Sequence, residues 1–410
     1  MKYVIIGNSA AAAGAVEGIR SVDAESETVI ISKEKYHMYS RPLISYYLCG
    51  KTDLQRMKYR PDDFYEKNGC TCLFGETAVR IDSVKKEVLL ESGKAVSYDK
   101  LLVATGSNPF VPPFKGLEKV KDKHSFMSLD DALELEKSLG KGKKVLIVGA
   151  GLIGLKCAEG IKDRVAEITV IDLSERVLSS ILDEEGSEMV KAHLEKNGIN
   201  LILGHTVTEF TENGAVTDSG EKIDFDILVT AVGVRPNTSL LTDIGAKANR
   251  GILTDSSMQT SIDGIYCAGD CCESDDVASG TSRVLALLPN AYRQGEAAGI
   301  AMAGGNTEFS GAIPMNAIGF FGLHIITAGV YEGETYEKRS DGCYKKLFYK
   351  DNLLKGYIMI GDVEKAGIYT SLIRNKTPLS DIDFGLICEK PSLMAFSRKY
   401  RNEKLGGRIQ

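Results

Sequence analysis

Two stretches of this chain share one pattern: an apolar run, a glycine-rich turn, a helix-forming segment and a second apolar run. In the clearer stretch the turn carries Gly149, Gly151 and Gly154, with the spacing G-x-G-x-x-G. The first glycine permits the tight turn, the second lets the backbone approach a pyrophosphate, and the third lets helix and strand pack closely. The helix N-terminus also favours an anion. The pattern predicts a βαβ unit that binds a dinucleotide; a purely structural glycine turn is the alternative.

Asp172 ends the second apolar run of this stretch, about 20 residues beyond the turn, where a carboxylate contacts the ribose of a bound dinucleotide. The carboxylate is expected to accept hydrogen bonds from the ribose hydroxyls and to repel a 2′-phosphate, which favours NADH. Arg176 leaves NADPH open, because an arginine nearby could accept that phosphate.

The amino-terminal stretch shows the same pattern in degenerate form. Gly7 keeps the first glycine, but Ser9 stands at the second position and Ala12 at the third. Both residues are small, so the backbone can still approach a ligand closely. An alanine-rich packing helix is the alternative interpretation. Glu34 follows the next apolar run and is the better candidate for the ribose carboxylate, with Lys33 beside it.

Further strand-like runs place these two units in one architecture. Residues 98–103 lead to Ala104-Thr105-Gly106, residues 224–229 lead to Ala231-Val232-Gly233, and residues 264–270 end in Gly269-Asp270. We therefore predict an α/β fold with two nested Rossmann-like domains, in which the second is inserted in the first. The outer domain is expected to cover residues 1–112 and 238–311, and the inner domain residues 113–237.

Beyond residue 312 the pattern changes. Residues 347–361 are typical of a hairpin around Asp351-Asn352, and residues 366–374 form a helix-like run. We predict a small α+β C-terminal domain over residues 312–410 that serves as an interface.

Composition excludes several classes of protein. The nine cysteines form no C-x-x-C pair, so a metal cluster is not expected within the chain. The formal net charge is −6 and no basic stripe is present, which argues against nucleic acid binding. No apolar run reaches the roughly 18 residues of a membrane span. The apolar start is interpreted as strand, turn and helix rather than as a signal peptide, so we expect a cytoplasmic protein.

Taken together, these motifs resemble the pyridine nucleotide–disulfide oxidoreductase superfamily. The matching segments are Gly7 to Ala12, Ala104 to Ser107, Gly149 to Gly154, Ala231 to Asn237 and Ala268 to Asp270. A second set is similar to the branch with rubredoxin reductases, oxygenase-coupled ferredoxin reductases and the flavin module of assimilatory nitrite reductases. These segments are Tyr39 to Leu43, Leu288 to Gly295 and Ile313 to Ala317. The resemblance implies that the outer domain binds FAD and the inner domain NAD(P)H. The carboxylate of Asp172 favours NADH of the two nucleotides.

The resemblance also implies how particular residues meet the flavin. Asp270 would hydrogen-bond the ribityl chain of FAD, Arg41 and Pro42 would lie near the flavin, and the helix start at Pro289–Ala291 would face the pyrimidine edge. That edge gains negative charge on reduction, which a helix N-terminus stabilises. Helix capping by Asp270 and a solvated surface position for Arg41 are the alternatives.

Two sets of contacts follow from the motifs and the resemblance. The predicted FAD contacts are Gly7, Ser9, Ala10, Ala12, Glu34, Arg41, Pro42, Val79, Ala104, Thr105, Gly106, Gly269, Asp270, Pro289 and Ala291. The predicted NAD(P) contacts are Gly149, Gly151, Leu152, Ile153, Gly154, Asp172, Arg176, Val232 and Gly233.

The chain departs from its relatives at the positions where they carry catalytic side chains. Disulfide reductases have a C-x4-C pair on the helix near the flavin. The corresponding residues 41–50 hold only Cys49, which is expected to lie at the helix end without reaching the flavin. Ferredoxin reductase-like relatives pair a lysine with a glutamate, but here Tyr46 and Lys156 stand at those positions. Lys156 is expected either to pair with Glu159 or to stabilise the anionic reduced flavin.

The sequence thus predicts a flavoenzyme that passes electrons between NADH and a redox protein. The direction of transfer is left open. The partner would be a ferredoxin- or rubredoxin-like protein or an iron–sulfur subunit, and the enzyme a homodimer or part of a larger complex. One alternative is an NADH oxidase or coenzyme A–disulfide reductase that uses Cys49. Another is a flavin-carrying redox sensor or docking subunit, which the altered Tyr46 and Lys156 positions favour. The only candidates for a catalytic side chain are Tyr46, Cys49 and Lys156, and none of them is assigned a definite role.

Overall fold

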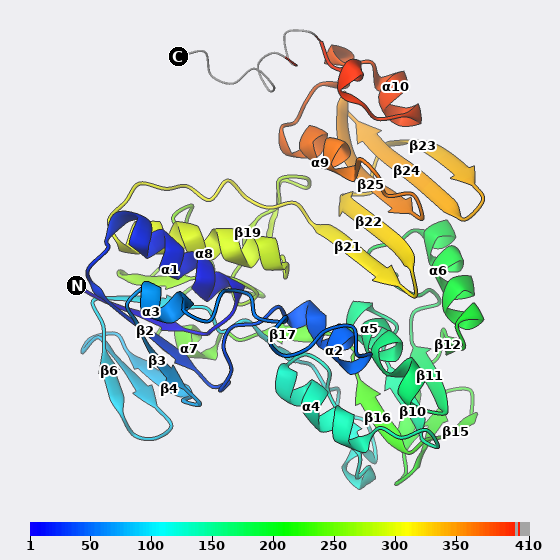
Figure 1. Cartoon of the computed structure of the whole chain (residues 1–410), viewed down its shortest axis with the longest axis horizontal. Coiled ribbons are helices and arrows are strands. Elements are labelled where there is room, and N and C mark those ends of the chain that lie inside the picture. The colour runs from blue at the N-terminus through cyan, green and yellow to red at the C-terminus, as the bar shows by residue number, and fades with distance from the viewer. Residues whose placement is uncertain (398–400, 402–410) are drawn as a thin grey trace. The chain divides into compact units, whose positions relative to one another are not determined.

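The computed structural model describes residues 1–397 and Arg401, which separate into two compact units (Figure 1). The first unit comprises Met1–Glu175, Gly198–Asp275 and Ser282–Ala312. The second comprises Arg176–Asn197, Asp276–Thr281 and the described residues from Ile313 onward. The predicted α/β fold with two Rossmann-like sheets and a distinct C-terminal domain is confirmed. The domain boundaries derived from the sequence stay a prediction.

The first unit contains a parallel sheet built around the amino-terminal strand. Its strands, in spatial order, are β18 (Ile265–Cys267), β7 (Lys100–Val103), β1 (Lys2–Ile6), β2 (Glu27–Ser32) and β3 (Cys70–Phe74). The apolar run of β1 is buried on both faces, as a central parallel strand requires. Helices α1 (Ala10–Val22) and α8 (Leu288–Met302) pack so closely that a Cβ on Gly295 would lie 1.9 Å from the Ala11 carbonyl oxygen.

A second parallel sheet belongs to the same unit. Its strands, in spatial order, are β12 (Asn200–Leu203), β11 (Glu167–Asp172), β10 (Lys144–Val148), β16 (Ile227–Thr230) and β9 (Lys123–His124). Helix α5 (Leu152–Ile161) follows β10 and packs on β10 and β11. The strand order reverses at β10, since β11 lies on one side and the later strand β16 on the other. Ligands of open α/β sheets bind at such a reversal, beyond the carboxyl ends of the strands.

Short elements complete the first unit. The antiparallel strands are β4 (Ala78–Asp82), β5 (Glu87–Leu90), β6 (Ala95–Ser97), β8 (Ser107–Pro109), β13 (Val207–Phe210), β14 (Gly214–Thr217), β15 (Lys222–Asp224), β17 (Val234–Pro236), β19 (Ser274–Asp275) and β20 (Ser282–Arg283). The helices are η1 (Arg41–Leu43), α2 (Ile44–Leu48), α3 (Phe64–Lys67), η2 (Leu117–Lys119), α4 (Leu129–Ser138), η3 (Lys162–Arg164) and α7 (Ser239–Thr242).

The second unit is built on a five-stranded antiparallel sheet. Its strands, in spatial order, are β21 (Met315–Phe320), β22 (Leu323–Gly329), β25 (Leu353–Ile360), β24 (Cys343–Lys350) and β23 (Glu334–Ser340). Its helices are α6 (Glu184–Lys196), α9 (Ala366–Arg374), η4 (Leu379–Asp381), α10 (Phe384–Glu389) and η5 (Leu393–Ala395). The predicted hairpin is confirmed: Asp351 and Asn352 join β24 to β25 with positive φ angles of 52° and 59°. The predicted helix over 366–374 is α9.

Helix α6 is fixed to this sheet through its N-cap. Asp183 accepts a hydrogen bond from the Gly186 N–H at 3.0 Å, from the Tyr344 hydroxyl at 2.7 Å and from the Lys346 ammonium at 2.9 Å. Burial opposes ionisation of Asp183, but these three donors hold the pKa of its carboxyl below the usual range. No helix in the described part of the chain is both long and apolar enough to span a bilayer.

Candidate functional site

The degenerate amino-terminal turn has the geometry of a glycine-rich dinucleotide turn. Gly7 follows β1 with a φ of +122°, and its N–H donates to the Ile31 carbonyl oxygen at 2.8 Å. A Cβ at this position would lie 2.2 Å from the Ala104 carbonyl oxygen, so only glycine fits. Helix α1 starts directly afterwards, and the Ser9 side chain makes no capping hydrogen bond. The N–H groups of the first turn therefore stay available to an anion.

The second glycine turn repeats this geometry beyond β10. Gly149 has a φ of +117°, its N–H donates to the Ile171 carbonyl oxygen at 2.8 Å, and a Cβ would lie 2.3 Å from the Ala231 carbonyl oxygen. A Cβ on Gly154 would lie 2.0 Å from the Gly149 carbonyl oxygen. Gly151, the N-cap of α5, differs because a Cβ there would meet nothing within 4 Å. The turn thus leaves open space over the helix start, where a pyrophosphate would approach.

Asp172 lies at the carboxyl end of β11, beside this turn. Its Oδ2 accepts a hydrogen bond from the Ala150 N–H at 2.6 Å, and its Oδ1 accepts one from the Ser174 N–H at 2.7 Å. These bonds fix the carboxylate next to the open space at Gly151. The neighbouring Leu173 is 68% exposed. Arg176 belongs to the second unit, where its guanidinium donates to the Leu182 carbonyl oxygen.

Glu34 lies in a buried polar cluster with Arg41 and Tyr39. The Arg41 Nη2 lies 2.7 Å from the Glu34 Oε2, and the Tyr39 hydroxyl donates to the Oε1 at 2.9 Å. The Leu129 N–H in turn donates to the Tyr39 oxygen at 2.8 Å. Burial and the nearby Glu34 carboxylate raise the pKa of Tyr39, so the phenol stays a hydrogen-bond donor. The alternative of a solvated Arg41 is wrong, because its guanidinium is held by a carboxylate that is only 7% exposed.

Asp270 lies close to this cluster. The Ser107 hydroxyl donates to its Oδ2 at 3.3 Å. Burial raises the pKa of the Asp270 carboxyl, although the Ser107 hydrogen bond and the charge of Arg41 oppose the rise. The alternative in which Asp270 caps a helix is wrong, because the next element along the chain is the strand β19. A carboxylate that accepts one hydrogen bond from the described residues keeps acceptor capacity for a ligand hydroxyl.

The start of α8 faces the Gly269-Asp270 turn. The Gly269 N–H donates to the Gln294 Oε1 at 2.8 Å, and a Cβ on Gly269 would lie 3.7 Å from the Ala291 Cβ. Asn290 donates through its Nδ2 to the Leu285 carbonyl oxygen at 2.9 Å. Its Oδ1 is buried and has no hydrogen-bond partner among the described residues. An orphaned acceptor at an uncapped helix start is the environment expected where a polar ligand is bound.

The segments that leave the two parallel sheets of the first unit are joined by a reciprocal set of hydrogen bonds. The Thr105 hydroxyl donates to the Asn237 carbonyl oxygen at 3.1 Å, and the Asn237 Nδ2 donates to the Thr105 carbonyl oxygen at 2.9 Å. The Asn237 N–H also donates to the Gly106 carbonyl oxygen at 2.9 Å. Strands β8 and β17 pair directly beside this junction. The two segments that connect the sheets therefore have a fixed register.

The three candidate catalytic side chains gather where α2 packs on α5. The Lys156 Nζ lies 4.5 Å from the centroid of the Tyr46 ring and forms an ion pair with Glu159, so that pairing is confirmed. A second ammonium, that of Lys51, lies 3.9 Å from the Glu159 Oε1. Cys49 is the C-cap of α2, and its thiol donates to the Tyr46 carbonyl oxygen at 3.4 Å.

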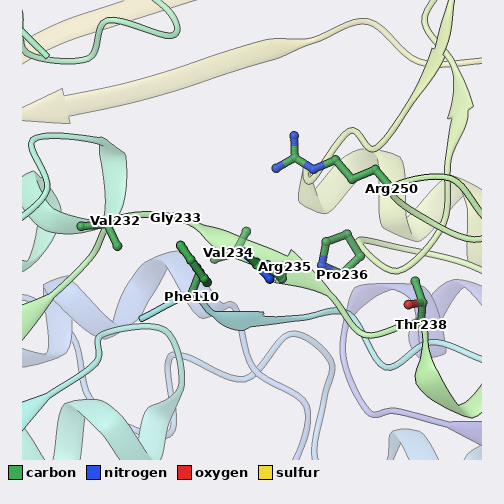
Figure 2. A pocket seen from close by; sticks show the side chains of 8 residues that line it. All are labelled: Phe110, Val232, Gly233, Val234, Arg235, Pro236, Thr238 and Arg250. Atoms are coloured by element: carbon green, nitrogen blue, oxygen red, sulfur yellow. The ribbon is translucent and has the colours of Figure 1, made fainter. Parts of the chain in front are cut away.

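Sequence reasoning missed part of the site and left other contacts untested. It missed Gln294 and Asn290, although both lie in the Leu288–Gly295 motif that carried the resemblance. Val79 lies on β4 and is 47% exposed, and its contact with FAD stays a prediction. Val232 and Gly233 line a pocket of about 510 Å³ beside β17 (Figure 2).

Comparison with known proteins places these features in context. Residues 1–295 match the family model described as pyridine nucleotide-disulphide oxidoreductase. Residues 314–377 match the one described as rubredoxin NAD+ reductase C-terminal domain.

Among curated relatives, subunit epsilon of an NADH-dependent phenylglyoxylate dehydrogenase from Aromatoleum evansii is 32% identical over 394 residues, which cover 93% of both chains. An NADH-rubredoxin oxidoreductase from Clostridium acetobutylicum is 29% identical over 82% of this chain and 85% of its own length. The NAD(P)H nitrite reductase of Bacillus subtilis is 30% identical over 93% of this chain, which spans only 48% of that protein.

Solved structures share the fold. The chain matches the structure of a covalent putidaredoxin reductase–putidaredoxin complex with a TM-score of 0.88, over 100% of this chain and 99% of that one, at 19% identity. It matches NADH:rubredoxin oxidoreductase from Clostridium acetobutylicum with a TM-score of 0.73, over 92% of this chain and 94% of that one, at 26% identity.

Proposed function

Because this chain belongs to the pyridine nucleotide-disulphide oxidoreductase family, we propose that it transfers electrons between NADH and a separate redox protein. It is an NAD(P)H-dependent flavoprotein oxidoreductase of the ferredoxin and rubredoxin reductase branch. The observation that carries the proposal is the pair of glycine turns with matching geometry in one compact unit. One turn fits each of two dinucleotides, and the Thr105–Asn237 junction fixes the register between the segments that carry them.

The described residues fit FAD at the amino-terminal turn. Helix α1 supplies N–H donors to a pyrophosphate, Asp270 offers a carboxylate acceptor, and Asn290 offers a buried amide oxygen without a partner. A bound flavin accepts a hydride and releases electrons singly, so it links a two-electron donor to a one-electron acceptor. The Glu34–Arg41 pair holds Arg41 in place by the start of α2, which makes its charge available near that site.

The inner segment would bind and orient the nicotinamide dinucleotide. The N–H groups at the start of α5 would hold the pyrophosphate over Gly151, where the structure leaves space. Asp172 would accept hydrogen bonds from the ribose hydroxyls, since its carboxylate is already fixed beside the turn by two backbone donors. This carboxylate supports a preference for NADH over NADPH, because it would repel a 2′-phosphate.

Replacing Asp172 tests that preference. We expect Asp172→Ala to raise the Kd for NADH by about ten- to a hundredfold, because a hydrogen bond to a charged group contributes about 1.5–3 kcal/mol. The Kd for NADPH should rise less or fall, because the repulsion is removed. Equilibrium titration of the holoprotein with each nucleotide measures both values. Asp163→Ala, which removes an exposed carboxylate from η3, is the matched control. If Asp172→Ala leaves the ratio of the Kd for NADPH to the Kd for NADH unchanged, the Asp172 carboxylate is not the basis of this preference.

The acceptor class is supported by the kind of relatives the chain has. The C-terminal segment matches a rubredoxin reductase domain, and one relative is described as an NADH-rubredoxin oxidoreductase. The relative from Aromatoleum evansii is described as a subunit of a dehydrogenase. A rubredoxin- or ferredoxin-like protein, or an iron–sulfur subunit of a complex, is therefore the acceptor that we propose. Homodimer formation is a further arrangement compatible with the proposal.

A Cys49→Ser variant separates this function from an NADH oxidase or coenzyme A–disulfide reductase. The Cys49 thiol lies at the C-terminal end of α2 and donates to a carbonyl oxygen of its own helix. We therefore expect NADH-dependent reduction of rubredoxin and ferredoxin to be unchanged in the variant. Cys343→Ser, in the second unit, is the matched control.

The same assay series includes molecular oxygen and coenzyme A disulfide as acceptors. We expect molecular oxygen and coenzyme A disulfide to be poor acceptors for the wild type and for Cys49→Ser alike. Fast reduction of either one by the wild type, lost in Cys49→Ser and kept in Cys343→Ser, would contradict the proposal and establish the thiol-dependent alternative.

A further inference from the structure

A pocket of about 510 Å³ lies in the first unit where β8 and β17 pair. It is lined by Phe110, the run from Val232 to Pro236, Thr238 and Arg250 (Figure 2). Figure 2 shows the Arg250 side chain extending from its own loop toward the Gly233 end of the pocket. Only Val232 and Gly233 of this lining belong to the predicted NAD(P) contacts.

The pocket is positively charged. Two arginines, Arg235 and Arg250, contribute to its wall, and no carboxylate lines it. Both side chains are exposed, and neither guanidinium has an ion pair or a hydrogen bond to any residue in the described part of the chain. Other arginines of this unit, such as Arg41 and Arg164, form an ion pair with a glutamate. Two unpaired guanidinium groups at one pocket leave an uncompensated charge that attracts an anion.

The geometry of Arg235 suits a ligand with an oxyanion. Its guanidinium carbon lies 3.9 Å from the centroid of the Phe110 ring, so the aromatic face holds one side of the planar group. The N–H donors in the plane of the guanidinium stay available. Their fork matches the two oxygens of a carboxylate or a phosphate. Thr238 adds a hydroxyl to the same wall.

The position in the fold also favours a ligand. Residues 231–236 follow β16, at the carboxyl end of the second parallel sheet and next to the strand-order reversal at β10. Small molecules bind along this edge of an open α/β sheet. Because the glycine turn of α5 follows β10, the Arg235–Arg250 pocket lies at the same edge as that turn, on a different strand.

We infer that this pocket binds a small molecule through an oxyanion, either a carboxylate or a phosphate group, held between Arg235 and Arg250. The inference goes beyond electron transfer between NADH and a redox protein. It assigns a second ligand to the chain. Charge and hydrogen bonds from the pocket residues would hold this ligand, rather than contacts with the flavin or the glycine turns.

Calorimetric titration of the holoprotein tests the inference, with inorganic phosphate and malonate as separate probes in a buffer held at constant ionic strength with potassium chloride. We expect saturable binding of at least one probe. Arg235→Gln and Arg250→Gln should each weaken that binding by about tenfold or more, and the double variant should abolish it. Arg56→Gln, which removes an exposed charge elsewhere in the unit, should bind like the wild type. The stronger of the two probes identifies the oxyanion class.

Two results would overturn the inference. One is the absence of saturable binding of both probes. The other is binding that persists in the double variant, which would place the anion elsewhere, for example at a glycine turn. Flavin content and NADH affinity are measured on the same variants. Normal values with no anion binding would refute the pocket and leave the proposed function intact. Wild-type NADH affinity in Gly151→Ala, together with anion binding that depends on Arg235 and Arg250, would instead count against the NADH site and leave the pocket intact.

Discussion

Gly151→Ala is expected to fold like the wild type and to raise the Kd for NADH by about tenfold or more. Gly151 has a φ of −82° and a ψ of −176°, which alanine adopts without strain, and its Cβ would meet nothing within 4 Å. The methyl group would instead occupy the space over the start of α5, where the pyrophosphate must approach the backbone N–H groups. Losing even one charge-assisted hydrogen bond there costs about 1.5–3 kcal/mol, or roughly ten- to a hundredfold in affinity.

The measurement is an equilibrium NADH titration of the holoprotein, with the thermal unfolding midpoint as the check on folding. Gly142→Ala is the matched control, because its Cβ also meets nothing within 4 Å but it lies in the loop before β10. Wild-type NADH affinity in Gly151→Ala would show that the dinucleotide does not use this turn.

Arg41→Leu is expected to lower the free energy of unfolding by about 2–3 kcal/mol. The substitution leaves the Glu34 carboxylate, only 7% exposed, with Tyr39 as its single remaining donor among the described residues. Removing one partner of a buried ion pair costs about 3–5 kcal/mol. The expected loss is smaller because the Arg41 side chain is 32% exposed, so water can partly replace it. Flavin retention should fall as well, since the charge beside the predicted FAD site is lost.

A double variant separates the ion pair from other effects of the substitution. Glu34→Gln combined with Arg41→Leu should recover part of the stability, because a neutral amide costs less to bury than an unpaired carboxylate. Arg56→Leu is the control. The Arg56 side chain is 76% exposed and its ion-pair partner Asp53 is 58% exposed, so the free energy of unfolding of this variant should be close to that of the wild type. Denaturant unfolding of the holoproteins provides the comparison. An Arg41→Leu protein as stable as the wild type would contradict the structural role of the pair.

The sequence predicted the elements whose geometry depends on local residues. The turn at Gly149 needs a backbone that only glycine supplies, and Asp351-Asn352 is a dipeptide that tolerates the left-handed conformation of a two-residue hairpin. Helix α9 follows from its own apolar spacing. The degenerate turn at Gly7 was harder to interpret, because Ser9 and Ala12 weaken the motif. Its geometry nevertheless depends on Gly7 alone, at the contact with Ala104.

Contacts between distant segments could not be predicted from local pattern. Thr105 and Asn237 are separated by 132 residues, and their reciprocal hydrogen bonds depend on how the two sheets are connected. The orphaned oxygen of Asn290 becomes visible only when the packing of α8 is known. Sequence comparison identified the Tyr46 and Lys156 positions, yet their cation–π contact depends on how α2 and α5 cross.

The central claim is that this chain holds a flavin and a nicotinamide dinucleotide so that electrons pass between them. Anaerobic stopped-flow mixing of the yellow holoprotein with NADH tests it most directly. We expect the flavin absorbance to be lost fast enough to support turnover with a rubredoxin- or ferredoxin-like acceptor. The same NADH concentration should bleach the flavin of Gly151→Ala more slowly. A protein that binds no flavin after reconstitution, or whose flavin absorbance takes minutes to respond to NADH or does not respond at all, would contradict it.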